Sequence, residues 1–301
     1  MKKSRALPLV SVIIPTRDRI TVFSQALQSV GEQSYPLIEI IVIDDFSNES
    51  ISSVIQDFQN KYPLISVITH RNSSALGGGY SRYYGTKLAN GDLICFLDDD
   101  DQYLQDKISI LEDYLHKNQQ VDAVFGRVII RTKDKKDNLI DYTNYMDRLS
   151  NTKDIVKLQT NGSLVRKTSF KHANFNIDLK KFQDTQFHLE LCRTCNVHLI
   201  KEPVAIWHKN YSKNQVSHIS PDNSKAVLTH FNSLREYLLS NNIINIEDKK
   251  FLQNQKFKYI AKLAQFNDFI NALRYETFFS RLVIIIYRIY YFFRSIYNFK
   301  S

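Results

Sequence analysis

The sequence predicts an α/β protein with a mixed, mainly parallel sheet flanked by helices, followed by a helical C-terminal extension. Short β-branched apolar runs alternate with segments of helical apolar spacing over the first hundred residues, which is typical of a parallel sheet with helical crossovers. The pattern becomes mixed after about residue 119, and only helical segments follow residue 225. With 301 residues, 43% of them hydrophobic, the chain can bury a substantial core.

Four apolar runs in the first half indicate buried parallel strands, because each is continuous, rich in Val and Ile, and followed by turn residues. Helical apolar spacing fills the intervals between them. A further helix is expected at 102–115, with Asp101 as its N-cap. The expected strands are 8–16, 38–43, 65–72 and 93–97, and the expected helices between them are 19–33, 50–62 and 78–91.

The second half is predicted to be mixed rather than regularly alternating. Its last strand is expected at a sheet edge, because Pro203 cannot donate to a sheet ladder. The expected strands are 121–134, 161–170 and 196–210, and the expected helices are 184–195, 225–240, 247–275 and 277–298.

The net charge of +9 is concentrated near the C-terminus. From Lys249 onward, ten Lys and Arg stand against two acids, a net charge of +8, and the rest of the chain is nearly neutral. A neutral body gives no reason to expect a nucleic-acid-binding surface. We therefore expect an α/β domain over residues 1–224, with halves 1–118 and 119–224, and a basic helical extension over residues 225–301.

The N-terminus and the cysteines indicate a cytoplasmic protein. The apolar stretch near the start is short, is interrupted by proline and lacks a small-residue cleavage site, so no secretory leader is expected. No stretch reaches the roughly 20 apolar residues of a membrane span. The three cysteines form no disulfide framework and fit a reducing compartment.

Polar side chains follow three of the predicted strands. They are residues 15–18, Asp44 with Asp45, and four consecutive acids at 98–101. The carboxyl ends of parallel strands meet at one edge of a sheet, where such sheets bind their ligands. Four adjacent carboxylates repel one another, so they are either solvated at a loop tip or bound to a divalent metal. We expect a common site at this edge.

Four stretches in this order, VSVIIPTRDR, IIVIDDFS, GGYSRYYGTKLANGDLICFLDDDD and FQDTQFHLEL, resemble the inverting family 2 glycosyltransferases that build bacterial surface polysaccharides. The resemblance covers residues 8–218 and implies the GT-A fold, the Rossmann-like fold of nucleotide-diphospho-sugar transferases. It also implies that residues 1–118 bind a nucleotide-sugar donor and that residues 119–224 bind the acceptor.

The resemblance implies a divalent metal site, because Asp98, Asp99 and Asp100 match the family's DxD motif. Asp100 would coordinate Mn²⁺ or Mg²⁺, with Asp98 as a second candidate ligand, and Asp98 or Asp99 would be oriented on the donor's ribose. Such a metal acts as a Lewis acid that neutralises the leaving nucleoside diphosphate, and oxygen ligands suit it. His208 lies where some members place a further metal or phosphate contact; a structural role is the alternative.

Further positions match the donor site of the family. Pro15 and Thr16 match the loop that packs on the donor's base, with Arg17 beside them. Asp45 matches the carboxylate that accepts a hydrogen bond from the base; a plain strand-end turn is the alternative. Arg82 would contact the diphosphate or brace the aspartates, and both roles stay open because Arg pairs strongly with either group.

Gln183 and Asp184 match the family's acid pair at the start of a helix. Displacement at the anomeric carbon requires the acceptor hydroxyl to lose its proton as it attacks, and a positioned carboxylate can accept that proton. Asp184 retains the position assigned to the base, whereas Gln183 replaces the usual Glu. The alternative is that Asp184 only stabilises the N-terminus of its helix.

The segment 277–298 combines a broad aromatic-aliphatic face with a narrow cationic stripe, because Arg281, Arg288 and Ser295 are spaced by seven. Such a helix suits an anionic bilayer surface. We therefore expect 277–301 to hold the protein peripherally on the inner face of the plasma membrane, with a lipid-linked acceptor. A helix packed on the catalytic domain, or a dimer helix, is the alternative.

We predict an inverting, metal-dependent glycosyltransferase that moves one hexosyl or hexosaminyl group from a nucleotide-sugar donor, expected to be a UDP-sugar, to a hydroxyl of a glycan acceptor. The product would enter capsule, lipopolysaccharide or exopolysaccharide. One alternative is a sugar nucleotidyltransferase, which should carry a glycine-rich N-terminal loop that IPTRDRITVF lacks. The other is a non-catalytic GT-A-like domain that binds glycan or membrane, which Gln183 would favour.

Overall fold

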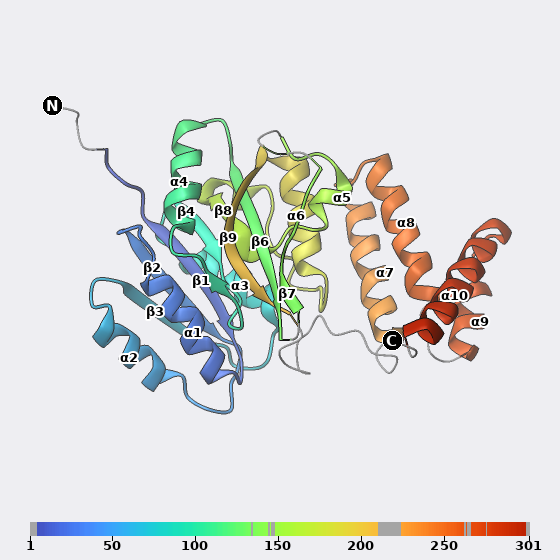
Figure 1. Ribbon diagram of the computed structural model, residues 1–301, viewed down its shortest axis with the longest axis horizontal. Helices are drawn as coiled ribbons and strands as arrows, with labels where there is room; N and C mark the ends of the chain where they lie inside the picture. Colours follow the sequence, from blue (N-terminus) through green and yellow to red (C-terminus); the bar gives the residue numbers. More distant parts are fainter. Residues whose placement is uncertain are drawn as a thin grey trace. The chain divides into compact units, whose positions relative to one another are not determined.

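The computed structural model (Figure 1) describes residues 5–133, 135–143, 145, 148–209, 224–261, 263, 266–274 and 276–298. The chain divides into two compact units. Unit 1 comprises Met1–Asp178 and Gln183–Tyr211, and unit 2 comprises Leu179–Phe182 and Ser212–Ser301. The expected boundary at residue 224 stays a prediction, because residues 210–223 lie outside the described residues.

Unit 1 is built on a mixed, mainly parallel sheet. The strands within the described residues are β1 (Val10–Thr16), β2 (Ile38–Asp44), β3 (Ser66–Arg71), β4 (Leu93–Phe96), β5 (Gln102–Tyr103), β6 (Ala123–Thr132), β7 (Lys135–Leu139), β8 (Ser163–Arg166) and β9 (Val197–His208). Their order is β3-β2-β1-β4-β8-β6-β9-β5, with β7 paired to β6. The first four strands in this order are parallel, β6 and β9 are parallel to each other, and β8 joins the two parallel groups as an antiparallel strand.

Helices cover both faces of this sheet (Figure 1). In unit 1 they are α1 (Ile20–Gly31), α2 (Ser52–Lys61), α3 (Gly78–Leu88), α4 (Lys107–Lys117), α5 (Thr152–Ile155) and α6 (Gln183–Thr194). Val12 and Ile14 of β1 share a buried cluster with Phe23 of α1. Ile13 faces α3 instead, because a Cβ on Gly85 would lie 2.5 Å from Ile13 Cγ2. Successive strand residues point to opposite faces, so β1 is apolar throughout because both its faces are covered.

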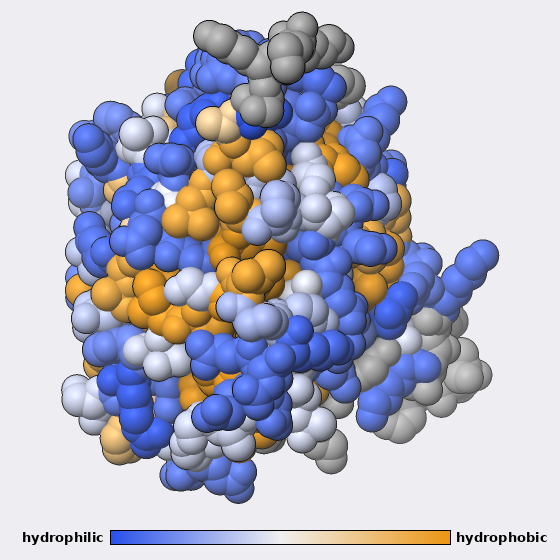
Figure 2. Space-filling view, turned by 90° about the vertical axis from the view of Figure 1, so that its left-hand side faces the viewer, coloured by the Kyte–Doolittle hydropathy of each residue, from blue (hydrophilic) through white to orange (hydrophobic). Residues whose placement is uncertain are grey.

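The side of unit 1 that carries α2 and β3 is turned to the viewer in Figure 2, where hydrophobic side chains form a band between hydrophilic ones. β3 stands at the end of the strand order, and each of its residues is exposed or half-buried. This edge of the sheet is therefore solvated, whereas β2 is buried along its whole length.

Two predictions for the middle of the chain were wrong. The helix expected from residue 102 begins only at Lys107, after the short strand β5. Asp101 is not its cap, because its carboxylate accepts hydrogen bonds from Asn161 Nδ2 at 2.7 Å and from the backbone N–H of His208 at 3.0 Å. β9 is not an edge strand, since it lies between β6 and β5, and the register shifts beside Pro203.

Unit 2 is a group of helices around a small core. Its helices are α7 (Ser224–Ser240), α8 (Ile246–Ala261), α9 (Phe266–Arg274) and α10 (Phe278–Asn298). The core is formed by Phe257, Ile260, Ala261, Leu263, Phe269, Leu273 and Ile284. The single helix expected at 247–275 was wrong: α8 ends at Ala261, and Arg288 Nη1 donates to the carbonyl of Leu263 at 2.8 Å. Leu263 lies two residues beyond the end of α8, so this bond holds the chain where it leaves the helix.

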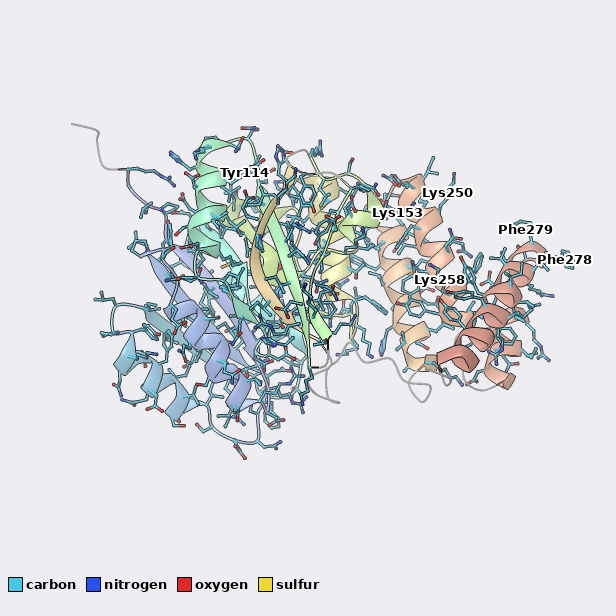
Figure 3. The ribbon with its side chains drawn as sticks, viewed as in Figure 1. Tyr114, Lys153, Lys250, Lys258, Phe278 and Phe279 are labelled. Carbon is cyan, nitrogen blue, oxygen red and sulfur yellow. The ribbon has the colours of Figure 1, made fainter. Side chains whose placement is uncertain are left out.

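Two arginines of the expected cationic stripe on α10 make contacts within unit 2. Arg281 Nε donates to the carbonyls of Leu273 and Glu276, both at 2.9 Å, and the Arg288 guanidinium lies 4.1 Å from the ring centre of Phe269. Both arginines are therefore engaged within unit 2. Among the described side chains of α10, Arg281 is exposed, and so are the large hydrophobic residues Phe278, Phe279, Leu282, Ile285, Ile286, Ile289 and Tyr290. Figure 3 shows Phe278 and Phe279 projecting from the start of this helix. Within the described ranges, no helix combines the length and hydropathy that a bilayer span needs.

Candidate active site

The loops after β1 and β4 meet at the carboxyl edge of the sheet, as the topology predicts. Thr16 Oγ1 donates to Asp99 Oδ2 at 2.9 Å, and the backbone N–H of Arg17 donates to the same oxygen at 3.3 Å. Pro15 precedes Thr16 as the penultimate residue of β1, next to Ile43 of the parallel neighbour β2. The residues that the sequence assigned to donor binding on these two loops are thus directly bonded to one another.

Arg19 neutralises part of the acid cluster. Its Nη1 donates to Asp99 Oδ1 and to Asp100 Oδ2, both at 3.0 Å. Burial, opposed by the charge of Arg19 and supported by that of Asp100, raises the pKa of Asp99 to about 6. Sequence reasoning did not assign Arg19 to the site; its place at the start of the first crossover helix, beside the strand end, was the available signal.

Arg82 of α3 is the second cation at the acid cluster. Its Nη2 forms a partly buried ion pair and hydrogen bond with Asp98 Oδ1. Burial alone would lower the pKa of Arg82, but Asp98 outweighs it, with further contributions from Asp184 and Asp99, so that the pKa is raised. The guanidinium also lies 5.6 Å from the ring centre of Phe175. Arg82 was predicted either to contact the diphosphate or to brace the aspartates. In the structure it contacts Asp98.

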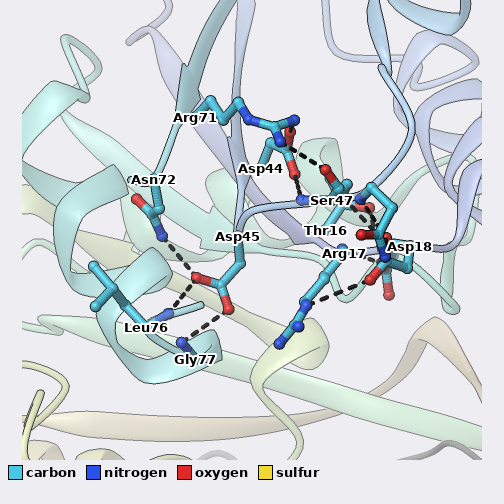
Figure 4. A network of polar contacts seen from close by, with 12 residues as sticks. Thr16, Arg17, Asp18, Asp44, Asp45, Ser47, Arg71, Asn72, Leu76 and Gly77 are labelled. Carbon is cyan, nitrogen blue, oxygen red and sulfur yellow. Dashed lines mark hydrogen bonds and ion pairs between the residues drawn. The ribbon is translucent and has the colours of Figure 1, made fainter. Parts of the chain in front are cut away.

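Asp45 binds the loop that opens α3 (Figure 4). Its carboxylate accepts hydrogen bonds from Asn72 Nδ2 and from the backbone N–H groups of Leu76 and Gly77, each at 2.8 Å. Gly77 has a φ of 93°, a conformation that favours glycine. Asp45 is thus held in place at the end of β2 by three hydrogen bonds.

Asp44 has a bracing role at the same strand end (Figure 4). It accepts hydrogen bonds from the backbone N–H of Ser47 at 2.8 Å and from Arg71 Nη1 at 2.9 Å. Ser47 Oγ in turn accepts from the backbone N–H of Asp18 at 3.1 Å. The turn after β2 is therefore tied to the loop after β1.

The start of α6 packs against the start of α3. A Cβ on Gly79 would lie 2.6 Å from Gln183 Cγ, so the absence of a side chain at Gly79 lets Gln183 approach. Asp184 is the next residue, and its charge contributes, after that of Asp98, to the raised pKa of Arg82. It also opposes the burial that lowers the pKa of His188. The predicted base Asp184 and the acid Asp98 therefore both act on the charge of Arg82.

Asp101 and His208 tie the second half of unit 1 to the acid cluster. Burial raises the pKa of Asp101 well above its ordinary value, and the charges of Asp98 and Asp100 raise it further. Asn161 supplies one of its hydrogen bonds. His208 Nε2 lies 3.3 Å from Gln102 Oε1.

A divalent metal fits the chemistry of these side chains. Adjacent carboxylates on one strand-end loop are the oxygen donors that Mn²⁺ and Mg²⁺ prefer, and two guanidinium groups already balance their charge. Among the described residues, however, no three His, Cys, Asp or Glu side chains are arranged as a metal site. The carboxylate oxygens are therefore of the type that binds such a metal. In the structure, Asp98 binds Arg82, whereas Asp99 and Asp100 bind Arg19.

The fold and this acid-rich edge define a glycosyltransferase of the GT-A type. The profile of the family described as "Glycosyl transferase family 2" matches residues 11–174, and the chain belongs to this family. The predicted family, fold class and enzyme class are confirmed.

Curated relatives include enzymes of bacterial glycan synthesis. The GalNAc(5)-diNAcBac-PP-undecaprenol beta-1,3-glucosyltransferase of Campylobacter jejuni is 33% identical over 133 residues, which cover 44% of this chain and 41% of that protein. The putative teichuronic acid biosynthesis glycosyltransferase TuaG of Bacillus subtilis is 27% identical over 149 residues, 48% of this chain and 58% of that protein. The match therefore spans less than two thirds of either relative.

Solved structures share the fold at low sequence identity. S. aureus TarS 1-349 in complex with UDP-GlcNAc has a TM-score of 0.59 at 14% identity, covering 93% of this chain and 79% of that chain. The mannosyltransferase PcManGT from Pyrobaculum calidifontis, in complex with GDP-Man and Mn²⁺, has a TM-score of 0.58 at 13% identity, with the same two coverages.

Proposed function

We propose that this protein is an inverting, metal-dependent glycosyltransferase that transfers one sugar from a UDP-sugar to a hydroxyl of a lipid-linked glycan in surface-polysaccharide synthesis. The observation that supports the proposal is the set of bonds at the carboxyl ends of β1 and β4, where Thr16, Arg19 and Arg82 bind the acids Asp98, Asp99 and Asp100. Asp184, at the start of α6, adds to the rise in the pKa of Arg82. Membership of family 2 argues against the alternative of a sugar nucleotidyltransferase.

Donor binding is assigned to the strand ends of the first half. Pro15, Thr16 and Arg17 would pack on the base, and Asp45 would accept a hydrogen bond from it. A carboxylate offers about four lone-pair positions, and three donors already use Asp45, so one position is open to a base N–H. Complexes of TarS with UDP-GlcNAc support a nucleotide-sugar donor in this fold.

The metal is assigned to Asp100 and Asp98, with Asp99 directed to the ribose and His208 as a further candidate ligand. When bound, Mn²⁺ or Mg²⁺ would neutralise the leaving diphosphate as a Lewis acid. Before it binds, Arg19 and Arg82 keep the acid run from repelling itself. The Mn²⁺ in the PcManGT complex supports this choice of ion.

Asp184 is assigned as the general base. The acceptor oxygen forms a bond to the anomeric carbon, the bond from that carbon to the diphosphate oxygen breaks, and the hydroxyl proton passes to the Asp184 carboxylate. One displacement of this kind inverts the configuration at the anomeric carbon. Arg82, whose pKa is raised by Asp98 and Asp184, holds a positive charge beside the site throughout.

Unit 2 is proposed to hold the enzyme on the cytoplasmic face of the membrane. Among the described side chains of α10, seven large hydrophobic ones are exposed, and an amphipathic helix of this kind lies in the bilayer interface. A lipid-linked acceptor is supported by the undecaprenol-linked substrate in the name of the C. jejuni relative. Residues 299–301 of the expected membrane segment lie outside the described residues.

Calorimetric titration of the full chain with UDP, with and without Mn²⁺, tests the donor and the metal together. We expect UDP to bind in the presence of Mn²⁺ and the Asp100→Ala variant to lose that binding, whereas Asp106→Ala, a nearby acid at the start of α4, should bind as the wild type does. Asp184→Asn should still bind UDP but turn over about 10²–10⁴-fold more slowly. Unchanged Mn²⁺-dependent affinity in Asp100→Ala would refute the metal assignment.

A further inference from the structure

A strained aromatic residue follows Asp45 directly. Phe46 has a φ of 67°, in the left-handed region that bulky side chains rarely adopt. Its side chain is 45% exposed, so burial of the ring does not compensate for the strain. Backbone strain of this kind persists where the surrounding structure holds it, and it concentrates at functional sites.

The surrounding contacts hold the ring in one position. The Arg71 guanidinium carbon lies 5.4 Å from the ring centre of Phe46. Arg71 is itself fixed, because it donates to Asp44 Oδ2 at 2.9 Å and to the carbonyl of Ser47 at 2.7 Å. The aromatic ring is therefore supported by a bonded cation and otherwise remains accessible to a ligand.

The turn that carries Phe46 lies between the two parts of the donor site. Asp45, on one side of Phe46, binds the loop that opens α3. Ser47, on the other side, binds the loop after β1 through the N–H of Asp18, and that loop reaches Asp99 through Thr16. A flat ligand that uses the open hydrogen-bond position of Asp45 would reach the adjacent ring.

We propose that Phe46 is the stacking platform for the nucleobase of the donor and therefore a residue that sets donor affinity. This inference rests on the proposed nucleotide-sugar donor. Every nucleobase has a π-face that stacks on aromatic rings, and such stacking contributes substantially to affinity. Asp45 would bind the edge of the base, while Phe46 would cover its face.

The test compares Phe46→Gly with Phe46→Tyr and the wild type in titrations with UDP and with inorganic pyrophosphate, all with Mn²⁺. We expect Phe46→Gly to weaken UDP binding roughly tenfold, to leave pyrophosphate binding unchanged, and to keep or raise the Tm because glycine accepts the positive φ. Phe46→Tyr should retain UDP affinity. Leu64→Gly, which removes a side chain that is 96% exposed, is the matched control and should bind both ligands normally.

Equal UDP affinity of Phe46→Gly and the wild type would overturn the inference while leaving the proposed function intact. A parallel loss of UDP and pyrophosphate binding would also overturn it, because the base would then not be the group that Phe46 contacts. If the wild type bound no nucleotide, the proposed function itself would fail, and the inference with it.

Discussion

His188 shows how burial changes the chemistry of one side chain next to the site. It lies on α6 one turn after Asp184, its ring centre is 5.4 Å from that of Phe125, and its Nε2 is 3.4 Å from Thr160 Oγ1. Burial lowers the pKa of His188 to about 4, with Asp184 acting to raise it and Arg82 to lower it. The folded protein therefore keeps this imidazole neutral where an exposed one is protonated.

The free energy of unfolding should accordingly fall as the pH drops from 6.5 toward 4. In this window the unfolded chain binds a proton at His188 that the folded chain does not bind, which costs up to about 3 kcal/mol of stability. Urea unfolding measured at pH 7 and at pH 4.5 gives the decrease in the free energy of unfolding between the two pH values. This decrease should be smaller for His188→Asn than for the wild type. His116→Asn, a change at an exposed histidine, is the control, and its free energy of unfolding should decrease as much as that of the wild type. An equal decrease in all three proteins would contradict this account.

The site residues that could be predicted from the sequence stand at the ends of strongly patterned elements. Asp45, the run 98–101 and Asp184 follow a buried strand or begin a helix, so the topology alone brings their loops to one edge. Arg19 was missed because its bridge between two aspartates depends on the conformation of a loop. Asp101 was misassigned because its partner Asn161 lies 60 residues away, and local sequence carries no signal for such a bond.

Among the elements, α3 and α6 determine the geometry of the proposed base. Gly79 Cα and Gln183 approach so closely that a methyl group on Gly79 would lie 2.6 Å from Gln183 Cγ. Gly79→Ala should therefore push the start of α6, and Asp184 with it, away from the acid cluster. Since displacements near 1 Å can cost about 100-fold in rate, we expect turnover to fall by about 10- to 100-fold, measured as kcat with saturating donor.

The matched double variant separates this geometric effect from other effects of alanine. Gln183→Ala removes the Cγ and Cδ atoms that the new methyl group would meet, so Gly79→Ala combined with Gln183→Ala should recover most of the lost kcat. Gln183→Ala alone should remain close to the wild type. If the double variant were as slow as Gly79→Ala, contact between the two helices would not be the cause.

The elements differ in how far their sequences reveal them. β1 to β4 could be predicted because burial on both faces demands continuous Val and Ile runs. β5 has two residues and β7 reads KKDNL, so neither carries an apolar pattern, and both exist only through pairing with β9 and β6. The separation of α8 from α9 could not be predicted either, because Arg288 of α10, which is distant in the sequence, binds the carbonyl of Leu263 between the two helices.

The proposed active site and the proposed membrane-binding helix lie in different units of the chain. The acid-rich edge belongs entirely to unit 1, whereas the exposed apolar face of α10 belongs to unit 2. Leu179–Phe182 belongs to unit 2 and directly precedes α6, with Phe182 packed 5.6 Å from Phe231 between ring centres. The chain therefore enters unit 2 immediately before the proposed base and returns to unit 1 with it.

Membrane attachment through α10 should depend on apolar insertion more than on charge, because large apolar side chains such as Leu282, Ile286 and Ile289 are at least half exposed on this helix. We expect the full chain to sediment with vesicles that contain anionic lipid and to remain largely bound at high salt, which screens charge attraction but not apolar burial. Replacing Leu282, Ile286 and Ile289 together by Ser should release it.

These three side chains are suitable because each is at least half exposed, so the core around Ile284 is left intact, which deletion of the helix would not achieve. Transfer to a soluble acceptor should continue in the triple variant, whereas the exposed Val22→Ser and Leu64→Ser changes in unit 1 should not affect sedimentation. Vesicle binding that survives the triple substitution would exclude α10 as the attachment surface. A different outcome is that the wild type does not bind vesicles and is a dimer in solution, whereas the triple variant is a monomer. The exposed face of α10 would then be a subunit interface.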